Sequence, residues 1–130
     1  MGAISFSLDP KLAKFLKHEL DISVFIETGT FAGDTIAELE PSFDQLVSIE
    51  IDDDLYAKAV SRFADSRKVE ILQGDSAQKL LEIQSQITDR SVMYWLDAHW
   101  CEGGGEGQSE SQCPLLEEIR SIKNLNSRSV

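Results

Sequence analysis

Residues 24–35, with the sequence VFIETGTFAGDT, constrain the fold of this chain more than any other stretch. An apolar segment runs into a carboxylate and two glycines, and the residues after them can begin a helix, which is typical of a strand leading into a nucleotide-binding turn. Gly29 can adopt a backbone conformation closed to other residues and admits a ligand close to the main chain. Gly33 is expected to let the next helix pack tightly on the strand. The spacing is E-x-G-x-x-x-G, because Phe31 stands where the dinucleotide fingerprint has its second glycine.

Strand and helix patterns alternate along the chain. Apolar runs predict strands at residues 22–26, 46–51, 69–72 and 92–96. Helical spacing and caps predict helices within residues 1–21, from about residue 33 to before Pro41, after residues 52–54, after residues 74–76, and from Pro114. Residues 98–113 are glycine-rich and are expected to form a long mobile loop. Crossover helices between strands predict a parallel, right-handed α/β sheet in a single domain spanning residues 1–130.

A carboxylate follows or closes each predicted strand. These residues are Glu27, Glu50, Asp75 and Asp97. In open parallel sheets, ligands bind beyond the carboxyl ends of the strands. The sequence therefore predicts an acidic ligand site at that edge.

Composition excludes several classes of partner. The net charge of -11, from 23 acidic and 12 basic residues, argues against nucleic acid, because phosphate neutralisation needs clustered Lys and Arg. The longest apolar run, residues 92–96, is too short to cross a bilayer, and the first twenty residues lack the layout of a signal peptide. Cys101 and Cys113 do not make a disulfide framework. We expect a cytoplasmic protein that binds small molecules.

Over roughly residues 22–123 these features resemble the class I S-adenosylmethionine-dependent methyltransferases. The resemblance implies a Rossmann-like three-layer sandwich with a mainly parallel sheet of strand order 3-2-1-4, without the C-terminal strands of the full methyltransferase fold. Leu96-Asp97-Ala98-His99 and Cys113-Pro114-Leu115-Leu116-Glu117-Glu118 are similar to a bacterial subgroup to which no substrate is assigned.

The resemblance also implies a role for each motif. The segment from Glu27 to Gly33 would surround the methionine and ribose portions of the cofactor, and Glu50 would bind the ribose hydroxyls. Gly74-Asp75-Ser76 would meet the adenine ring, and the segment from Leu96 to His99 would face the reactive methyl group and the substrate. The residues expected to bind the cofactor are Glu27, Thr28, Gly29, Thr30, Phe31, Gly33, Asp34, Thr35, Glu50, Ile51, Gly74, Asp75, Ser76 and Asp97.

Elementary chemistry agrees with these roles. The Glu50 carboxylate can accept hydrogen bonds from both ribose hydroxyls. S-adenosylmethionine carries no phosphate, so Phe31 is no obstacle, and its sulfonium suits an acidic site. Methyl transfer needs the nucleophile and the methyl carbon aligned at ~3 Å. Asp97 and His99 are the candidate catalytic bases, and His99 is favoured by its intrinsic pKa.

Some of these residues also have purely structural explanations. Asp75 and Asp52 can cap helices, His99 can be a loop residue, and Trp95 and Trp100 are expected to serve packing. A zinc site using His99, Cys101 and Cys113 with Glu102 or Glu106 is an alternative, but the spacing matches no tight ligand pattern. A divalent ion held by Asp97 and substrate oxygens is another, and no metal ligands are assigned.

The sequence stops about where a fifth strand would begin, which would leave the fourth strand at an apolar edge. We expect the chain to self-associate through that edge, or to cover it with its terminal segments. Three functions follow as hypotheses. The first is a methyltransferase acting on a small-molecule, sugar-like hydroxyl or an amine. The second is a non-catalytic fragment that binds the cofactor and works through assembly. The third is a NAD-dependent oxidoreductase, which Phe31 and Glu27 disfavour.

Overall fold

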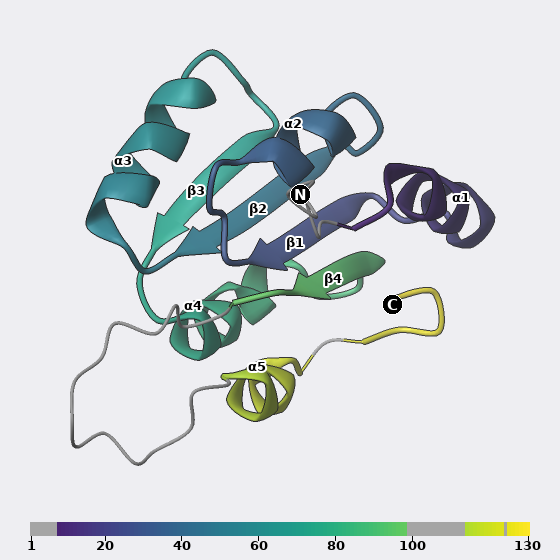
Figure 1. Ribbon diagram of the computed structural model, residues 1–130. Coiled ribbons are helices and arrows are strands. Elements are labelled where there is room, and N and C mark those ends of the chain that lie inside the picture. Colours follow the sequence, from purple (N-terminus) through teal and green to yellow (C-terminus); the bar gives the residue numbers. More distant parts are fainter. Residues whose placement is uncertain (1–7, 99–113, 124) are drawn as a thin grey trace, which may run out of the picture.

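A computed structural model describes residues 8–98, 114–123 and 125–130. Strands and helices alternate along these residues, as the sequence predicts (Figure 1). The elements, in chain order, are α1 (Pro10–Leu20), β1 (Val24–Thr28), α2 (Asp34–Leu39), β2 (Gln45–Glu50), α3 (Asp53–Arg62), β3 (Val69–Gln73), α4 (Ser76–Ile83), the 3-10 turn η1 (Gln84–Gln86), β4 (Val92–Leu96) and α5 (Leu115–Ser121).

The four strands form one parallel sheet in the order β3-β2-β1-β4, which confirms the predicted topology. β1 is an inner strand, paired with β2 on one side and with β4 on the other. In this register Glu27 lies opposite Ser48 of β2 and Trp95 of β4. The carboxyl ends of all four strands therefore point in the same direction.

Helices cover both faces of the sheet and complete the predicted three layers (Figure 1). On one face, Phe25 and Leu46 belong to a buried apolar cluster that also contains residues of α1 and α2. On the other face, Val24 and Ile26 pack in a second cluster with Leu80 of α4. Successive residues of a strand point to opposite faces, so β1 buries apolar side chains on both sides of the sheet. α5 packs against α4 on the second face.

Aspartate side chains cap the N-terminal ends of α1 and α3. The Asp9 side chain accepts a hydrogen bond from the N–H of Lys11 and is followed by Pro10 in the first turn of α1. The Asp52 side chain accepts from the N–H of Leu55 at 2.9 Å and begins α3, which confirms its predicted role as a cap.

The first strand lies later than the sequence predicts, at Val24–Thr28 rather than residues 22–26. Ile22 is buried but precedes the sheet, and its N–H donates to the Lys17 carbonyl at the end of α1. Glu27 and Thr28 are polar, yet both are buried strand residues. β1 is an inner strand, so its backbone is paired on both sides. Residues in or directly after the neighbouring strands donate hydrogen bonds to the Glu27 and Thr28 side chains. A local sequence pattern cannot reveal these partners.

The C-terminal residues cover part of the edge of β4. The N–H of Val130 donates to the Val92 carbonyl at 3.0 Å, and the Val130 carbonyl accepts from the N–H of Tyr94 at 2.7 Å. This is the bonding pattern of parallel strands. The Ser129 hydroxyl oxygen also accepts from the N–H of Val92. The chain therefore uses its own terminal segment here, which is the second of the two predicted ways to cover this edge.

Two further predictions can be compared with the described residues. Within them, no helix is both long and apolar enough to cross a bilayer. The predicted loop at residues 98–113 lies outside the described part of the chain, apart from Ala98.

We expect Val130→Pro to open the edge of β4, because proline has no N–H to donate to the Val92 carbonyl. The variant should self-associate more strongly than the unchanged chain as concentration rises, which sedimentation velocity measures. Val130→Ala keeps the backbone N–H and is the matched control. Equal association by the two variants would show that the terminal pairing does not protect the edge.

Candidate functional site

Three acidic side chains share one face of the sheet at its carboxyl rim, by which we mean the C-terminal ends of the strands and the turns after them. Phe25, Leu46 and Met93 all lie in the cluster covered by α1 and α2. Glu27 is two residues after the first of these, and Glu50 and Asp97 are each four residues after the others. Because side chains alternate along a strand, the direction set by these apolar residues carries the acids to the same face.

Glu50 is held rigidly at the end of β2. Its Oε2 accepts a hydrogen bond from the N–H of Phe31 at 3.0 Å, and its Oε1 accepts from the N–H groups of Ile51 and Asp52, both at 3.0 Å. The residue is 6% exposed. The bond from Phe31 joins the glycine turn of β1 to the end of β2. Each carboxylate oxygen has more than one lone pair, so Glu50 can still accept from a ligand.

The turn after β1 lies against the end of β4. Gly29 has φ +80°, and a Cβ added there would stand 2.6 Å from the Asp97 carbonyl oxygen, so only glycine fits. The Thr28 hydroxyl oxygen accepts from the N–H groups of Asp97 and Ala98 at 3.1 and 3.2 Å. These contacts fix the main chain at Asp97 relative to the glycine turn.

Glu27 belongs to a buried chain of hydroxyl groups. Ser48 donates its hydroxyl to Glu27 Oε1 at 2.6 Å, and the Thr30 hydroxyl lies 2.6 Å from the Ser48 hydroxyl. A serine has one proton to donate, so with Ser48 donating to Glu27, Thr30 donates to Ser48. Sequence reasoning assigned no role to Ser48. The available signal was a hydroxyl in the middle of an otherwise apolar strand.

Burial raises the pKa of the Glu27 carboxyl from 4.5 to about 8. The hydrogen bond from Ser48 opposes this rise in pKa, while the negative charges of Asp97 and Glu50 add to it. Glu27 therefore holds a proton at neutral pH, in contrast to an exposed glutamate.

This proton makes folding stability depend on pH. Between pH 4.5 and about 8 the folded chain keeps the Glu27 proton while the unfolded chain loses it, so the free energy of unfolding falls as pH rises through this window. Glu27→Gln stays neutral at every pH. We expect it to be more stable than the unchanged chain at pH 8.5 by a few kcal/mol, with a much smaller difference at pH 5, in urea denaturation.

Glu82→Gln is the matched control for this prediction. Glu82 is exposed on α4, and its pKa is lowered by hydrogen bonds from Lys79 and Gln78. Its titration therefore lies below the tested window, and the difference in stability between Glu82→Gln and the unchanged chain should be the same at pH 5 and pH 8.5. An effect of Glu27→Gln that is equally independent of pH would contradict the protonation of Glu27.

The second half of the glycine motif faces α3. A Cβ at Gly33 would stand 2.9 Å from the Phe63 ring, so Gly33 allows close packing on the end of α3 and not, as the sequence suggested, on its own strand. Asp34 pairs with Arg62 at 2.7 Å, and its side chain is 74% exposed. Asp34, which was predicted to bind cofactor, uses its carboxylate in this ion pair.

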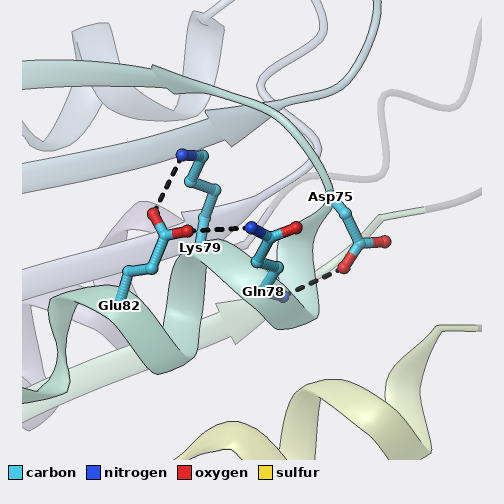
Figure 2. Close-up of polar contacts among 4 residues, drawn as sticks. All are labelled: Asp75, Gln78, Lys79 and Glu82. Atoms are coloured by element: carbon cyan, nitrogen blue, oxygen red, sulfur yellow. Dashed lines mark hydrogen bonds and ion pairs between the residues drawn. The ribbon is translucent and has the colours of Figure 1, made fainter.

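Asp75 has a structural role as the N-cap of α4. Its Oδ1 accepts from the N–H of Gln78 at 2.9 Å and begins the helix (Figure 2). Gln78 and Lys79 in turn contact Glu82 on the same helix (Figure 2). The backbone of the Asp75 turn still touches the rim, because the N–H of Gly74 donates to the Glu50 carbonyl at 3.0 Å. The carboxyl rim therefore gathers the carboxylates of Glu27, Glu50 and Asp97 on one face. The fourth predicted acid, Asp75, caps α4.

Several predicted ligands fall outside the described residues. These are His99, Cys101, Cys113, Glu102 and Glu106, and with them the zinc hypothesis and one catalytic candidate. Within the described part of the chain, no three His, Cys, Asp or Glu side chains gather closely enough to hold a metal ion.

A surface hollow of about 320 Å³ lies at the opposite, amino edge of the sheet. Arg67, Lys68 and Arg90 line it together with Asp44 and Glu70. The mixture of charges gives it no clear ligand preference. The converging acids and the glycine turn are at the carboxyl rim, so we assign the candidate site there.

Gly29→Ala tests the close approach of the turn to β4. Gly33→Ala is the matched control, because the two glycines have similar φ angles of +80° and +84° and so similar strain as alanine, on the order of 1–2 kcal/mol. The added methyl group at Gly29 meets the backbone of Asp97, whereas at Gly33 it meets a side-chain ring. We expect Gly29→Ala to lose more stability in urea denaturation; equal losses would show that the contact with Asp97 imposes no constraint.

Comparison with solved structures supports the observed fold. No family model and no curated protein matches the chain. A methyltransferase of Podospora anserina bound to S-adenosylhomocysteine is similar over 92% of this chain and 49% of its own, with a TM-score of 0.65 and 10% identity. The O-methyltransferase TomG of Streptomyces achromogenes, in complex with S-adenosylmethionine, gives a TM-score of 0.56 and 23% identity over 74% of this chain and 47% of its own. An O-methyltransferase of Bacillus cereus in complex with S-adenosylhomocysteine gives a TM-score of 0.57 and 19% identity over 72% and 47%.

At these identities the likeness establishes the fold. The chain has the Rossmann-like fold on which these methyltransferases are built, and it spans about half the length of the structures that it matches.

Proposed function

We propose that this chain binds S-adenosylmethionine at its carboxyl rim and transfers the methyl group to a small molecule through a hydroxyl or amine. The observation that carries the proposal is Glu50, a buried carboxylate fixed by three backbone N–H groups, one of them from the glycine turn of the neighbouring strand. A ribose presents two adjacent hydroxyl groups, and a fixed carboxylate can accept from both.

The apolar residues beside Glu50 support the same ligand. Phe31 is 69% exposed and Ile51 is 46% exposed, and the backbone N–H of each bonds to the Glu50 carboxylate, so two exposed apolar residues adjoin it. A nucleoside has one polar sugar edge and one flat apolar base, and it would cover this surface while its hydroxyls reach Glu50. The resemblance to proteins solved with S-adenosylmethionine or S-adenosylhomocysteine favours the adenosine of that cofactor.

The remaining rim residues are suited to the transfer itself. When bound, the cofactor supplies an electrophilic methyl group on a positively charged sulfur. Asp97, at the end of β4, would orient the acceptor and receive its proton, directly or with His99. A protein of this kind has to hold two reactants in line, and the contacts of Thr28 and Gly29 with the Asp97 backbone would keep that geometry fixed. We place the activity in the cytoplasm, with a small-molecule partner.

Calorimetric titration with S-adenosylhomocysteine and with NAD tests the binding proposal. We expect S-adenosylhomocysteine to bind and NAD not to bind, because Phe31 fills the position where a pyrophosphate would need a glycine. Glu50→Gln replaces an acceptor by a donor, and a hydrogen bond to a charged group contributes ~1.5–3 kcal/mol, so the affinity should fall roughly ten- to hundredfold.

Glu82→Gln, on an exposed face of α4, is the control for that substitution and should bind as the unchanged chain does. Unchanged affinity in a folded Glu50→Gln, judged by circular dichroism, would remove Glu50 from the site. Binding of NAD in preference to S-adenosylhomocysteine would favour the oxidoreductase hypothesis.

Transfer of a labelled methyl group to a panel of small hydroxyl and amine acceptors distinguishes an enzyme from a binding module. Labelled product supports the methyltransferase. Binding without transfer to any acceptor, together with concentration-dependent association in sedimentation velocity, would support the alternative that the chain binds the cofactor and acts through self-association at the fourth-strand edge.

A further inference from the structure

Glu27 occupies the centre of the acidic rim. β1 lies between β2 and β4, so Glu27 stands between Glu50 and Asp97. Only 2% of the residue is exposed, and its carboxyl accepts a hydrogen bond from the Ser48 hydroxyl, which in turn bonds to the Thr30 hydroxyl. The charged groups that act on it lie at the ends of the two flanking strands, Glu50 as the last residue of β2 and Asp97 directly after β4, and both are acidic. Within the described residues, no basic side chain offsets their charge at Glu27.

The order of the strands fixes which part of the cofactor Glu27 would meet. Under the proposed function, the ribose binds Glu50 at β2, and methyl transfer takes place beside Asp97 at β4. The sulfur connects the ribose carbon to the methyl group, so it lies between these two positions, over the end of β1. Glu27 is the acidic side chain of that strand end.

We propose that Glu27 discriminates the positively charged sulfonium of S-adenosylmethionine from the neutral sulfur of S-adenosylhomocysteine, by giving up its proton when the sulfonium binds; this inference rests on the proposed function. The Glu27 O–H bond breaks, its electrons stay on the carboxylate, and the proton passes to solvent. The new negative charge faces the positive sulfur.

The expected dependence on pH follows from linkage. Free Glu27 has a raised pKa of about 8, and a bound cation lowers that pKa because it favours the ionised carboxylate. Below pH 8, sulfonium binding must therefore remove a proton, which weakens binding by at most about tenfold for each pH unit. Binding should tighten as pH rises toward 8 and level off above it.

The test is the ratio of the affinities for the two ligands at pH 6.5 and pH 8.5. The α-ammonium groups of the two ligands also titrate, and the sulfonium lowers the pKa of the one in S-adenosylmethionine, so the change in the ratio is compared with that of Glu27→Gln, which shares this contribution. We expect the preference for S-adenosylmethionine to rise about tenfold between the two pH values in the unchanged chain. In Glu27→Gln, which keeps an acceptor for Ser48 and carries no titrating proton, the ratio should change several-fold less than in the unchanged chain.

Calorimetry in phosphate and in Tris at pH 7 gives an independent measurement on the unchanged chain. Because the two buffers differ in ionisation enthalpy, the apparent heats reveal how many protons are released. More protons should be released with S-adenosylmethionine than with S-adenosylhomocysteine. This measurement holds even if Glu27→Gln fails to fold, and Glu82→Gln should behave as the unchanged chain does in both tests.

The outcomes separate the two proposals. If both ligands bind with a ratio that does not change with pH, or if Glu27→Gln keeps the pH-dependent ratio, the role of Glu27 is wrong and the proposed function stands. If neither ligand binds at any pH between 6.5 and 8.5, the proposed function fails and this inference fails with it.

Discussion

The parallel pairing of β1 with both β2 and β4 is the constraint on which the candidate site depends. It brings the carboxyl ends of three strands together, and the alternation of side chains then directs Glu27, Glu50 and Asp97 to one face. The glycine turn adds the second requirement, because Gly29 must lie against the Asp97 backbone. A shift of one residue in the register of β1 would turn Glu27 into the other face and disassemble the site.

The same pairing gives two glutamates different environments. Glu50 ends its strand and accepts three backbone N–H groups, so it is anchored at the rim. Glu27 lies inside its strand with one hydroxyl donor and two acidic neighbours, and its pKa is raised to about 8. One carboxylate is therefore suited to hold a polar ligand edge, and the other to respond to a ligand's charge. The burial that makes Glu27 responsive also lowers folding stability above pH 4.5.

The glycine motif has more than one structural purpose. Gly29 serves the junction of β1 with β4, whereas Gly33 serves packing on Phe63, and the adjacent Asp34 pairs with Arg62 of α3. The first half of the motif thus belongs to the candidate site and the second half to the attachment of α3. At the opposite edge of β4, Val130 supplies the pairing that an apolar edge strand needs.

The sequence by itself determined the alternation of strands and helices, the strand order through its family resemblance, and the acidic character of the rim, because apolar periodicity, caps and glycine spacing are local signals. Only the tertiary structure decided that β1 extends through Glu27 and Thr28, that Ser48 bonds to Glu27, and that the Asp75 carboxylate caps α4. The physical reason is that strand length and side-chain partners depend on contacts with neighbouring strands and helices. These contacts join residues that lie far apart in the chain, so a local sequence pattern does not contain them.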